Sequence, residues 1–226
     1  MTDLRPGASV VRHRAAALLG ALQELVLPVP CTGCGAVGPP ICADCRLALH
    51  PAPVQRLVGA PPLPVVSGLP YDGVARAVLL AFKNDGRTEH GPPLAAALLA
   101  ALTIAVQGLD APPELVPMPS TIRSSRDRGY DPVRVVLRRA GLPSRRLLRL
   151  QRRGEDQRDL GRAERQANAA GSMRSLPAAG ARVLLVDDVV TTGSTLLEAA
   201  RAVREAGGTV LGAVTVASTP VRSART

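Results

Sequence analysis

Residues 182–206 constrain the fold most strongly, because they join a fully apolar strand to a helix through two acids and a short loop. The run Arg182–Asp187 contains four consecutive branched apolar residues, Val183 to Val186. Such a run is typical of a strand buried on both faces, as in parallel sheets that helices cover. Ser194–Ala206 has apolar residues at helical spacing and ends before Gly207-Gly208. The segment therefore predicts an α/β fold.

The rest of the main body alternates in the same way. Strands are predicted at 65–70, 114–118, 146–150 and 209–217, and helices at 73–82, 92–107, 130–140 and 159–169. Alternating strands and helices place neighbouring strands parallel, because each helix forms a crossover connection. We therefore expect a mostly parallel sheet flanked by helices.

The chain divides into three predicted regions. Residues 1–50 hold an N-terminal helix and all four cysteines, residues 51–64 form a Pro-rich linker, and residues 65–226 form the α/β domain. The apolar run 15–22 is too short to span a bilayer, and no small-residue cleavage site follows it. We therefore expect a cytoplasmic protein without a membrane span.

The four cysteines form two pairs, Cys31 with Cys34 and Cys42 with Cys45. Two such C-x-x-C pairs close together suit a tetrahedral Zn²⁺ ion with four thiolate ligands. A redox-active pair would explain one half of the pattern and leave the other without a role. Disulfides are rare in cytosolic proteins. The sequence thus predicts a structural zinc site, with His50 as a less favoured substitute ligand.

Two acids, Asp187 and Asp188, follow the apolar run, and the residues 191–195, Thr-Thr-Gly-Ser-Thr, come next. We call residues 191–195 the Thr-Gly loop. Its backbone N–H groups, its hydroxyls and the N-terminus of the following helix can together bind a phosphate dianion. The two carboxylates can accept hydrogen bonds from ribose hydroxyls or contact Mg²⁺. A helix cap and a turn would explain one or two of these residues, and a P-loop is excluded because Asn84 follows Lys83.

The formal net charge is +10, and Lys83 is the single lysine. Between residues 121 and 170, 14 arginines stand against 6 acids. This local excess suits a polyanionic ligand, since arginine pairs well with phosphate oxygens. Nucleic acid would use the same charge, although a single-strand surface usually also needs aromatic residues, which make up 1% of the chain.

The segment 183–195 resembles the signature of type I phosphoribosyltransferases: an apolar strand, two acids and a Thr-Thr-Gly-Ser-Thr loop. The resemblance implies that Asp187 and Asp188 hold the ribose hydroxyls of phosphoribosyl pyrophosphate and act in catalysis, with Mg²⁺. It also implies a type I phosphoribosyltransferase-like fold for the main domain. The residues that would contact the ribose and its 5-phosphate are Asp187, Asp188, Val189, Thr191, Thr192, Gly193, Ser194 and Thr195.

The whole chain resembles the ComF family, also called competence protein F or the amidophosphoribosyltransferase-like family. The four-cysteine module comes first, and Lys83-Asn84-Asp85-Gly86-Arg87 then matches a Lys-x-x-Gly-Arg stretch. Further similar motifs are Val116-Pro117-Met118-Pro119, Arg128-Gly129-Tyr130-Asp131 and Gln157 to Asn168. The chain departs from the family pattern at Asp131, where Asn is usual, and at Gly154 and Met173.

The resemblance leaves two functions open. One is a phosphoribosyltransferase, in which a cationic group stabilises the leaving pyrophosphate. Lys83 would be catalytic there, and the pyrophosphate candidates are Lys83, Arg87, Arg123, Arg126 and Arg128. The other is a nucleotide- or DNA-binding accessory protein for DNA uptake, with single-stranded DNA or uptake proteins as partners. A homodimer is compatible with both.

Overall fold

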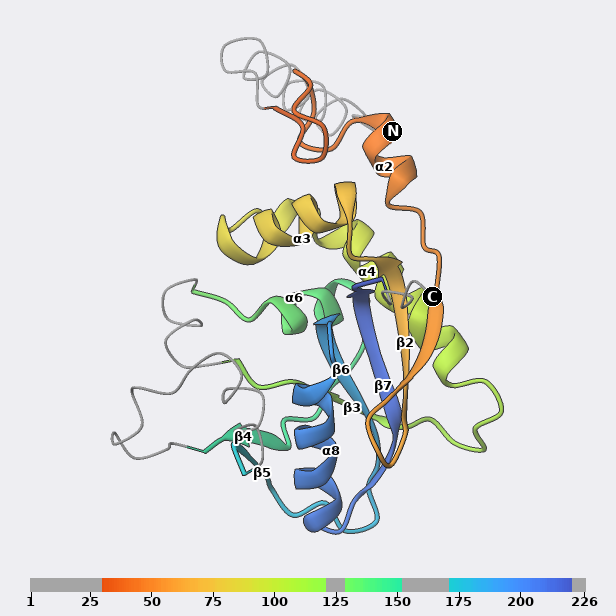
Figure 1. Ribbon diagram of the computed structural model, residues 1–226. Coiled ribbons are helices and arrows are strands. Elements are labelled where there is room, and N and C mark those ends of the chain that lie inside the picture. The colour runs from red at the N-terminus through yellow and green to blue at the C-terminus, as the bar shows by residue number, and fades with distance from the viewer. Residues whose placement is uncertain (1–29, 121–128, 152–170, 221–226) are drawn as a thin grey trace, which may run out of the picture.

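The computed structural model of the chain describes residues 30–120, 129–151 and 171–220. A five-stranded sheet in the order β1-β2-β7-β6-β3 forms its centre (Figure 1). These strands are β1 (Val54–Val58), β2 (Leu63–Pro70), β3 (Glu114–Pro117), β6 (Arg182–Val190) and β7 (Thr209–Ser218). The pairs β2–β7, β7–β6 and β6–β3 are parallel, and only β1 runs antiparallel to its neighbour β2. The predicted mostly parallel sheet is confirmed.

Helices cover both faces of this sheet. One core joins the sheet to α3 (Gly73–Asn84), α4 (Gly91–Ala105) and α6 (Pro132–Arg139), and the 3-10 helix η1 (Thr88–His90) links the first two. The other core holds α8 (Ser194–Glu205) and a two-stranded antiparallel sheet of β4 (Leu148–Leu150) and β5 (Met173–Ser175). The N-terminal module, with α2 (Ala43–Ala48), lies beside α3 (Figure 1). Within the described ranges, no helix is long and apolar enough to cross a lipid bilayer.

Strand β6 belongs to both cores. Leu184 and Val186 lie in the core with α4 and α6, whereas Val183 and Leu185 lie in the core with α8. All four side chains are at most 2% exposed. Because successive side chains of a strand point to opposite faces, an unbroken apolar run is what a strand covered on both faces requires. The α/β prediction from this run is therefore confirmed.

Three strands differ from the sequence-based expectations. The segment predicted as a linker contains β1, which pairs with β2 from Val54↔Ser67 to Val58↔Leu63. Strand β6 continues to Val190, so both acids lie within the strand and not after its end. Strand β5 is an addition to the predicted elements, and it forms an antiparallel pair with β4. The predicted helices at 1–27 and 159–169 lie outside the described residues.

Strand β2 and helix α4 approach each other more closely at Gly68 than any side chain would allow. A Cβ atom built on Gly68 would lie 2.1 Å from the carbonyl oxygen of Ala97 and 2.5 Å from its carbonyl carbon. The neighbouring Ser67 hydroxyl is buried and bonds to the Thr215 hydroxyl of β7 at 2.7 Å. The absence of a side chain at position 68 therefore fixes the spacing between the sheet and α4.

We expect Gly68→Ala to lower the free energy of unfolding by about 3 kcal/mol, because the added methyl group meets rigid backbone. Urea denaturation measures the change. Gly108→Ala is the control for a methyl group added in open space, since a Cβ at Gly108 meets nothing within 4 Å. Gly108 has a positive φ, so its substitution should cost about 1 kcal/mol from backbone strain alone. Equal losses in the two variants would contradict the close approach.

Candidate functional site

The carboxyl ends of the parallel strands lie at one edge of the sheet. Asp187 and Asp188, which we call the acidic pair, lie near this end of β6, and the Thr-Gly loop follows the strand directly. Thr191 and Thr192 are exposed, and Gly193 is buried with φ +82°. Gly193 precedes the first turn of α8 and provides no side-chain cap. The Ser194 N–H has only a 3.4 Å contact with the Thr192 hydroxyl. The N-terminus of α8 therefore keeps N–H groups that can donate hydrogen bonds to an anion.

Asp187 and Asp188 differ in their surroundings although they are adjacent. The Asp188 N–H donates to Asp187 Oδ1 at 2.9 Å, and Lys83 Nζ lies 2.8 Å from Asp188 Oδ2. Burial, reinforced by the negative charge of Asp188, raises the pKa of Asp187 to about 7. Near neutral pH, Asp187 is therefore partly protonated, while Asp188 is the carboxylate that contacts Lys83.

A third carboxylate, Asp131, faces this pair. It caps α6 by accepting the Arg134 N–H at 3.2 Å. Burial raises the pKa of Asp131 and the negative charge of Asp188 acts in the same direction, whereas a hydrogen bond from Ser120 and the charge of Arg146 oppose the rise. The sequence marks Asp131 only as a departure from a family pattern. Asp131-Pro132 has the pattern of a helix N-cap followed by Pro. The place of this carboxylate among the acids depends on how α6 packs, which sequence spacing does not show.

The structure brings some of the predicted site residues together. Lys83, in the last turn of α3, meets the acids of β6, and Phe82 beside it packs edge-on against Tyr130 with ring centroids 5.9 Å apart. Arg87 precedes η1 and is half-buried. Arg123, Arg126 and Arg128 lie outside the described residues, as does the motif from Gln157 to Asn168.

Strand β1 supplies contacts to the Thr-Gly loop that the sequence does not predict. Arg56 Nη2 donates to the Thr191 carbonyl at 2.6 Å, and Val58 packs against Gly193. The prolines of residues 51–64 indicate a linker, so the sequence does not predict a strand there. Only the β-branched residues Val54 and Val58, which are spaced to share one face of a strand, could have signalled it.

The four cysteine thiols converge, with sulfur atoms that all lie within 4.8 Å of one another. Cys34 Sγ and Cys42 Sγ are 3.7 Å apart, close to the roughly 3.8 Å between sulfurs of a tetrahedral zinc site. Burial opposes ionisation of Cys31, yet backbone N–H groups led by that of Cys42 lower its pKa to about 6. Burial raises the pKa of Cys45. This cluster can hold a metal ion.

The cysteine module is attached to the α/β domain through buried contacts. Cys31 and Cys45 lie in the same core as α3 and α4. The Thr32 hydroxyl bonds to His90 Nε2 at 2.8 Å, and the His90 side chain is completely buried. Burial lowers the pKa of His90, so this imidazole is neutral. The module therefore packs on the helices that lead to and from Lys83.

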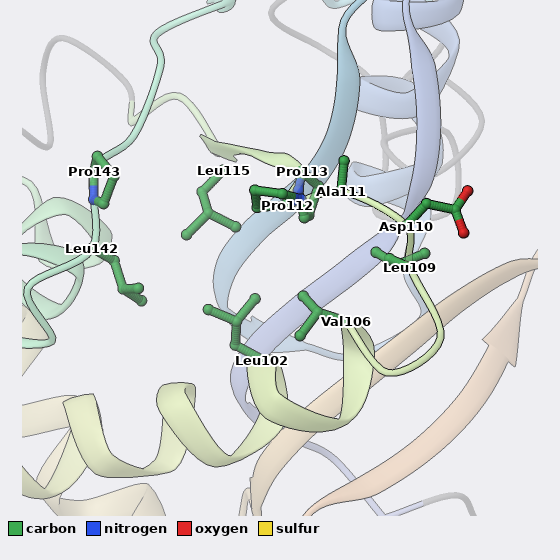
Figure 2. A pocket seen from close by; sticks show the side chains of 10 residues that line it. All are labelled: Leu102, Val106, Leu109, Asp110, Ala111, Pro112, Pro113, Leu115, Leu142 and Pro143. Carbon is green, nitrogen blue, oxygen red and sulfur yellow. The ribbon is translucent and has the colours of Figure 1, made fainter.

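A separate pocket of about 460 Å³ lies between the end of α4 and the start of β3 (Figure 2). Apolar residues such as Leu102, Val106 and Leu142 line it. Asp110 is the one charged residue of its lining, and its carboxylate points away from the apolar side chains (Figure 2). The lining thus offers no set of converging polar groups, and β3 starts at the amino edge of the sheet. This pocket is therefore not the site of the acidic pair.

One family model matches the C-terminal part of the chain. Residues 128–225 match the family model of the phosphoribosyl transferase domain, a range that includes the acidic pair, the Thr-Gly loop and α8. The chain is 43% identical over 61 residues to the orotate phosphoribosyltransferase of Pyrobaculum calidifontis (strain DSM 21063 / JCM 11548 / VA1), covering 26% of this chain and 32% of that protein. It is 60% identical over 38 residues to the orotate phosphoribosyltransferase of Mycobacterium avium (strain 104), covering 17% of this chain and 21% of that protein.

These matches span a third or less of the curated relatives' own length. Among solved structures, the adenine phosphoribosyltransferase from Leishmania tarentolae is 16% identical, with a TM-score of 0.38, covering 73% of this chain and 82% of that chain.

The raised pKa of Asp187 predicts a pH-dependent stability. The folded protein keeps the proton of Asp187 up to about pH 7, whereas the unfolded chain loses it near pH 4. The contribution of Asp187 to the free energy of unfolding therefore decreases as the pH rises from about 4 to about 7. Asp187→Asn should therefore be more stable than the wild type by about 1–2 kcal/mol at pH 8, and nearly equal to it at pH 4.5. Urea denaturation at the two pH values measures this, with exposed Asp110→Asn as the control. An Asp187→Asn variant with the same free energy of unfolding as the wild type at pH 8 would contradict the raised pKa of Asp187.

Proposed function

We propose that this protein is a ComF-like member of the type I phosphoribosyltransferases that binds phosphoribosyl pyrophosphate with Mg²⁺ at the carboxyl edge of its sheet. The observation that carries the proposal is the acidic pair on β6 with the Thr-Gly loop and the N-terminus of α8 directly after it. The family match over 128–225 includes all three. The cytoplasmic location expected from the sequence belongs to the same proposal.

The 5-phosphate would be bound by the Thr-Gly loop. Exposed Thr191 and Thr192 offer hydroxyl and backbone donors, and α8 adds N–H groups with the positive end of its dipole. Gly193 adopts the positive φ of the loop without strain, and its lack of a side chain lets the loop backbone lie against Val58 of β1. The loop itself contains no cationic side chain, so main-chain geometry provides most of the binding.

The ribose hydroxyls would donate to Asp187 and Asp188. Carboxylate oxygens are also the protein ligands that Mg²⁺ prefers, together with phosphate oxygens of a substrate, so this acidic edge fits the ion. When bound, Mg²⁺ would neutralise negative charge on the pyrophosphate. Lys83 is paired with Asp188 in the structure, and a ligand that takes over Asp188 would leave the ammonium group directed to the pyrophosphate.

Transfer would break the bond between ribose C1 and the pyrophosphate oxygen and form a bond from C1 to a nitrogen of a base or amine. The pyrophosphate leaves with the bonding electron pair, and the attacking nitrogen loses a proton. Cations that stabilise the leaving group lower this barrier most. Lys83 and Arg87 are the candidates within the described residues, and Arg123, Arg126 and Arg128 belong to the same proposal.

Isothermal titration calorimetry with phosphoribosyl pyrophosphate and Mg²⁺ tests the binding. We expect Asp187→Asn combined with Asp188→Asn to weaken binding about 100-fold, since two charge-assisted contacts contribute about 1.5 kcal/mol each. Asp110→Asn should bind like the wild type, because Asp110 lies by the apolar pocket. Unchanged binding in the double variant would overturn the proposed site.

Pyrophosphate release with a panel of bases and amines then separates the two functions. Release that depends on the acceptor identifies a transferase, and Lys83→Met should lower its rate about 100-fold. Binding without release for the whole panel favours the nucleotide- or DNA-binding accessory role. Binding of a fluorescent single-stranded oligonucleotide, measured at two salt concentrations, examines that role directly.

We further propose that the four cysteines hold one structural Zn²⁺ ion. The convergence of four sulfur atoms and the N–H donors to Cys31 and Cys42 suit thiolate ligands. Four protein ligands leave no open position, so the ion would support the fold and take no part in catalysis.

Freshly purified protein should contain about one zinc per chain by mass spectrometry under native conditions. Chelation should lower the melting temperature, because zinc binding and folding of such modules are coupled. Cys34→Ser removes a ligand with little burial, whereas His50→Ala tests the substitute ligand and should keep the metal. Less than about half an equivalent of zinc in the wild type would argue against the site.

A further inference from the structure

The hydrogen bonds between atoms of the Thr-Gly loop itself are long and few. Among its own atoms, the Thr192 hydroxyl contacts the Ser194 hydroxyl at 3.2 Å and the Ser194 N–H at 3.4 Å. Main-chain donors that bind an anion must keep a fixed direction, because any reorientation on binding costs free energy. Support from outside the loop is therefore required.

Arg56 gives this support from β1, a strand 135 residues away in sequence. Its Nη2 donates to the Thr191 carbonyl at 2.6 Å, and its Nη1 to the Thr219 carbonyl at 3.3 Å. Thr191 follows β6 and Thr219 follows β7, so one planar guanidinium ties together the exits of two adjacent strands. Thr219 N–H also donates to the Val190 carbonyl at 3.0 Å, which closes the connection.

The charge of Arg56 is not used in an ion pair within the described residues, where the guanidinium donates to neutral carbonyls. Its Nε is buried without a hydrogen bond there, and burial lowers its pKa. Burial of Nε without a partner is a desolvation cost that no contact within these residues offsets. A cation that contacts the Thr191 carbonyl does, however, attract a phosphate dianion bound at the Thr-Gly loop.

The same strand also determines the position of Gly193. A Cβ on Gly193 would lie 2.8 Å from Val58 Cβ, so the loop backbone rests directly on β1. In the turn that follows β1, Gly59 lies against α8, and a Cβ added to it would be 2.5 Å from a methyl carbon of Leu197. β1 and its turn thus contact both the Thr-Gly loop and the start of α8.

We infer that Arg56 is the positioning residue of the Thr-Gly loop, fixing its donors for the 5-phosphate of the ligand through the Thr191 and Thr219 carbonyls. This inference rests on the proposed function, and it deepens that function by assigning β1 to the phosphate end of the site. Arg56 acts through the loop and is not a catalytic residue. It should therefore affect ligands that carry a 5-phosphate and leave the pyrophosphate end unaffected.

Calorimetry with three probes in the full-length protein tests this: phosphoribosyl pyrophosphate, ribose 5-phosphate and inorganic pyrophosphate, each with Mg²⁺. For Arg56→Ala we expect binding of the first two to weaken about tenfold or more, since a hydrogen bond from a charged donor is lost. Pyrophosphate should bind within about twofold of the wild type. Arg56→Lys keeps the charge but loses the two-pronged geometry, so its loss should be intermediate.

Hydrogen exchange of the ligand-free protein gives an independent readout. Amides of residues 191–197 should exchange faster in Arg56→Ala, while those of β3 should not change. Exposed Arg174→Ala on β5 is the matched control and should behave like the wild type in both experiments. If Arg56→Ala does not fold, Arg56→Lys provides the same comparison.

The outcomes are distinguishable. Equal weakening of all three probes, or no weakening of any, overturns the role of Arg56 and leaves the proposed function standing. A wild-type protein that binds neither phosphoribosyl pyrophosphate nor ribose 5-phosphate overturns the proposed function, and the inference with it. Selective loss of the two 5-phosphate ligands, with faster exchange in the loop, supports the inference.

Discussion

The burial of β6 on both faces is the constraint on which the rest of the structure depends. Val183 to Val186 fill two cores at once, so helices must cover both sides of the strand, the arrangement in which parallel neighbours are found. Parallel neighbours end at a common edge, and the chain places its acids and its Thr-Gly loop there. The close approach of Gly68 to Ala97 sets how near α4 can come to the same sheet. Site geometry thus follows from core packing.

Negative and positive groups lie next to each other at that edge of the sheet. Asp131, Asp187 and Asp188 repel one another, and Lys83 pairs with Asp188. A few residues away, the N-terminus of α8 and the guanidinium of Arg56 provide positive potential. A ligand with hydroxyls at one end and phosphate at the other would match this sequence of negative and positive regions. The half-buried acids are costly to the fold, which is usual where function determines the residues.

The α/β class and most elements of the main domain could be predicted from the sequence, since the apolar run 183–186 and the helix from Ser194 have unambiguous periodicity. The convergence of four cysteines also followed from spacing alone. β1 was missed because the prolines of residues 51–64 suggest a linker, although edge strands tolerate proline nearby. The contacts of Arg56 and Asp131 depend on tertiary packing, which sequence spacing does not encode. The roles of the arginines before Gly129 stay predictions.

Lys83 has a practical consequence beyond its ion pair. It is the only lysine of the chain, its side chain is 33% exposed, and it touches the acidic pair of the candidate site. Apart from the α-amino group, it is therefore the only amine that an acylating or reductively alkylating reagent can modify. Isotopic methylation of this amine would place a single spectroscopic label in the site. The sequence thus contains a chemical reporter of occupancy, and no residue has to be added or removed to use it.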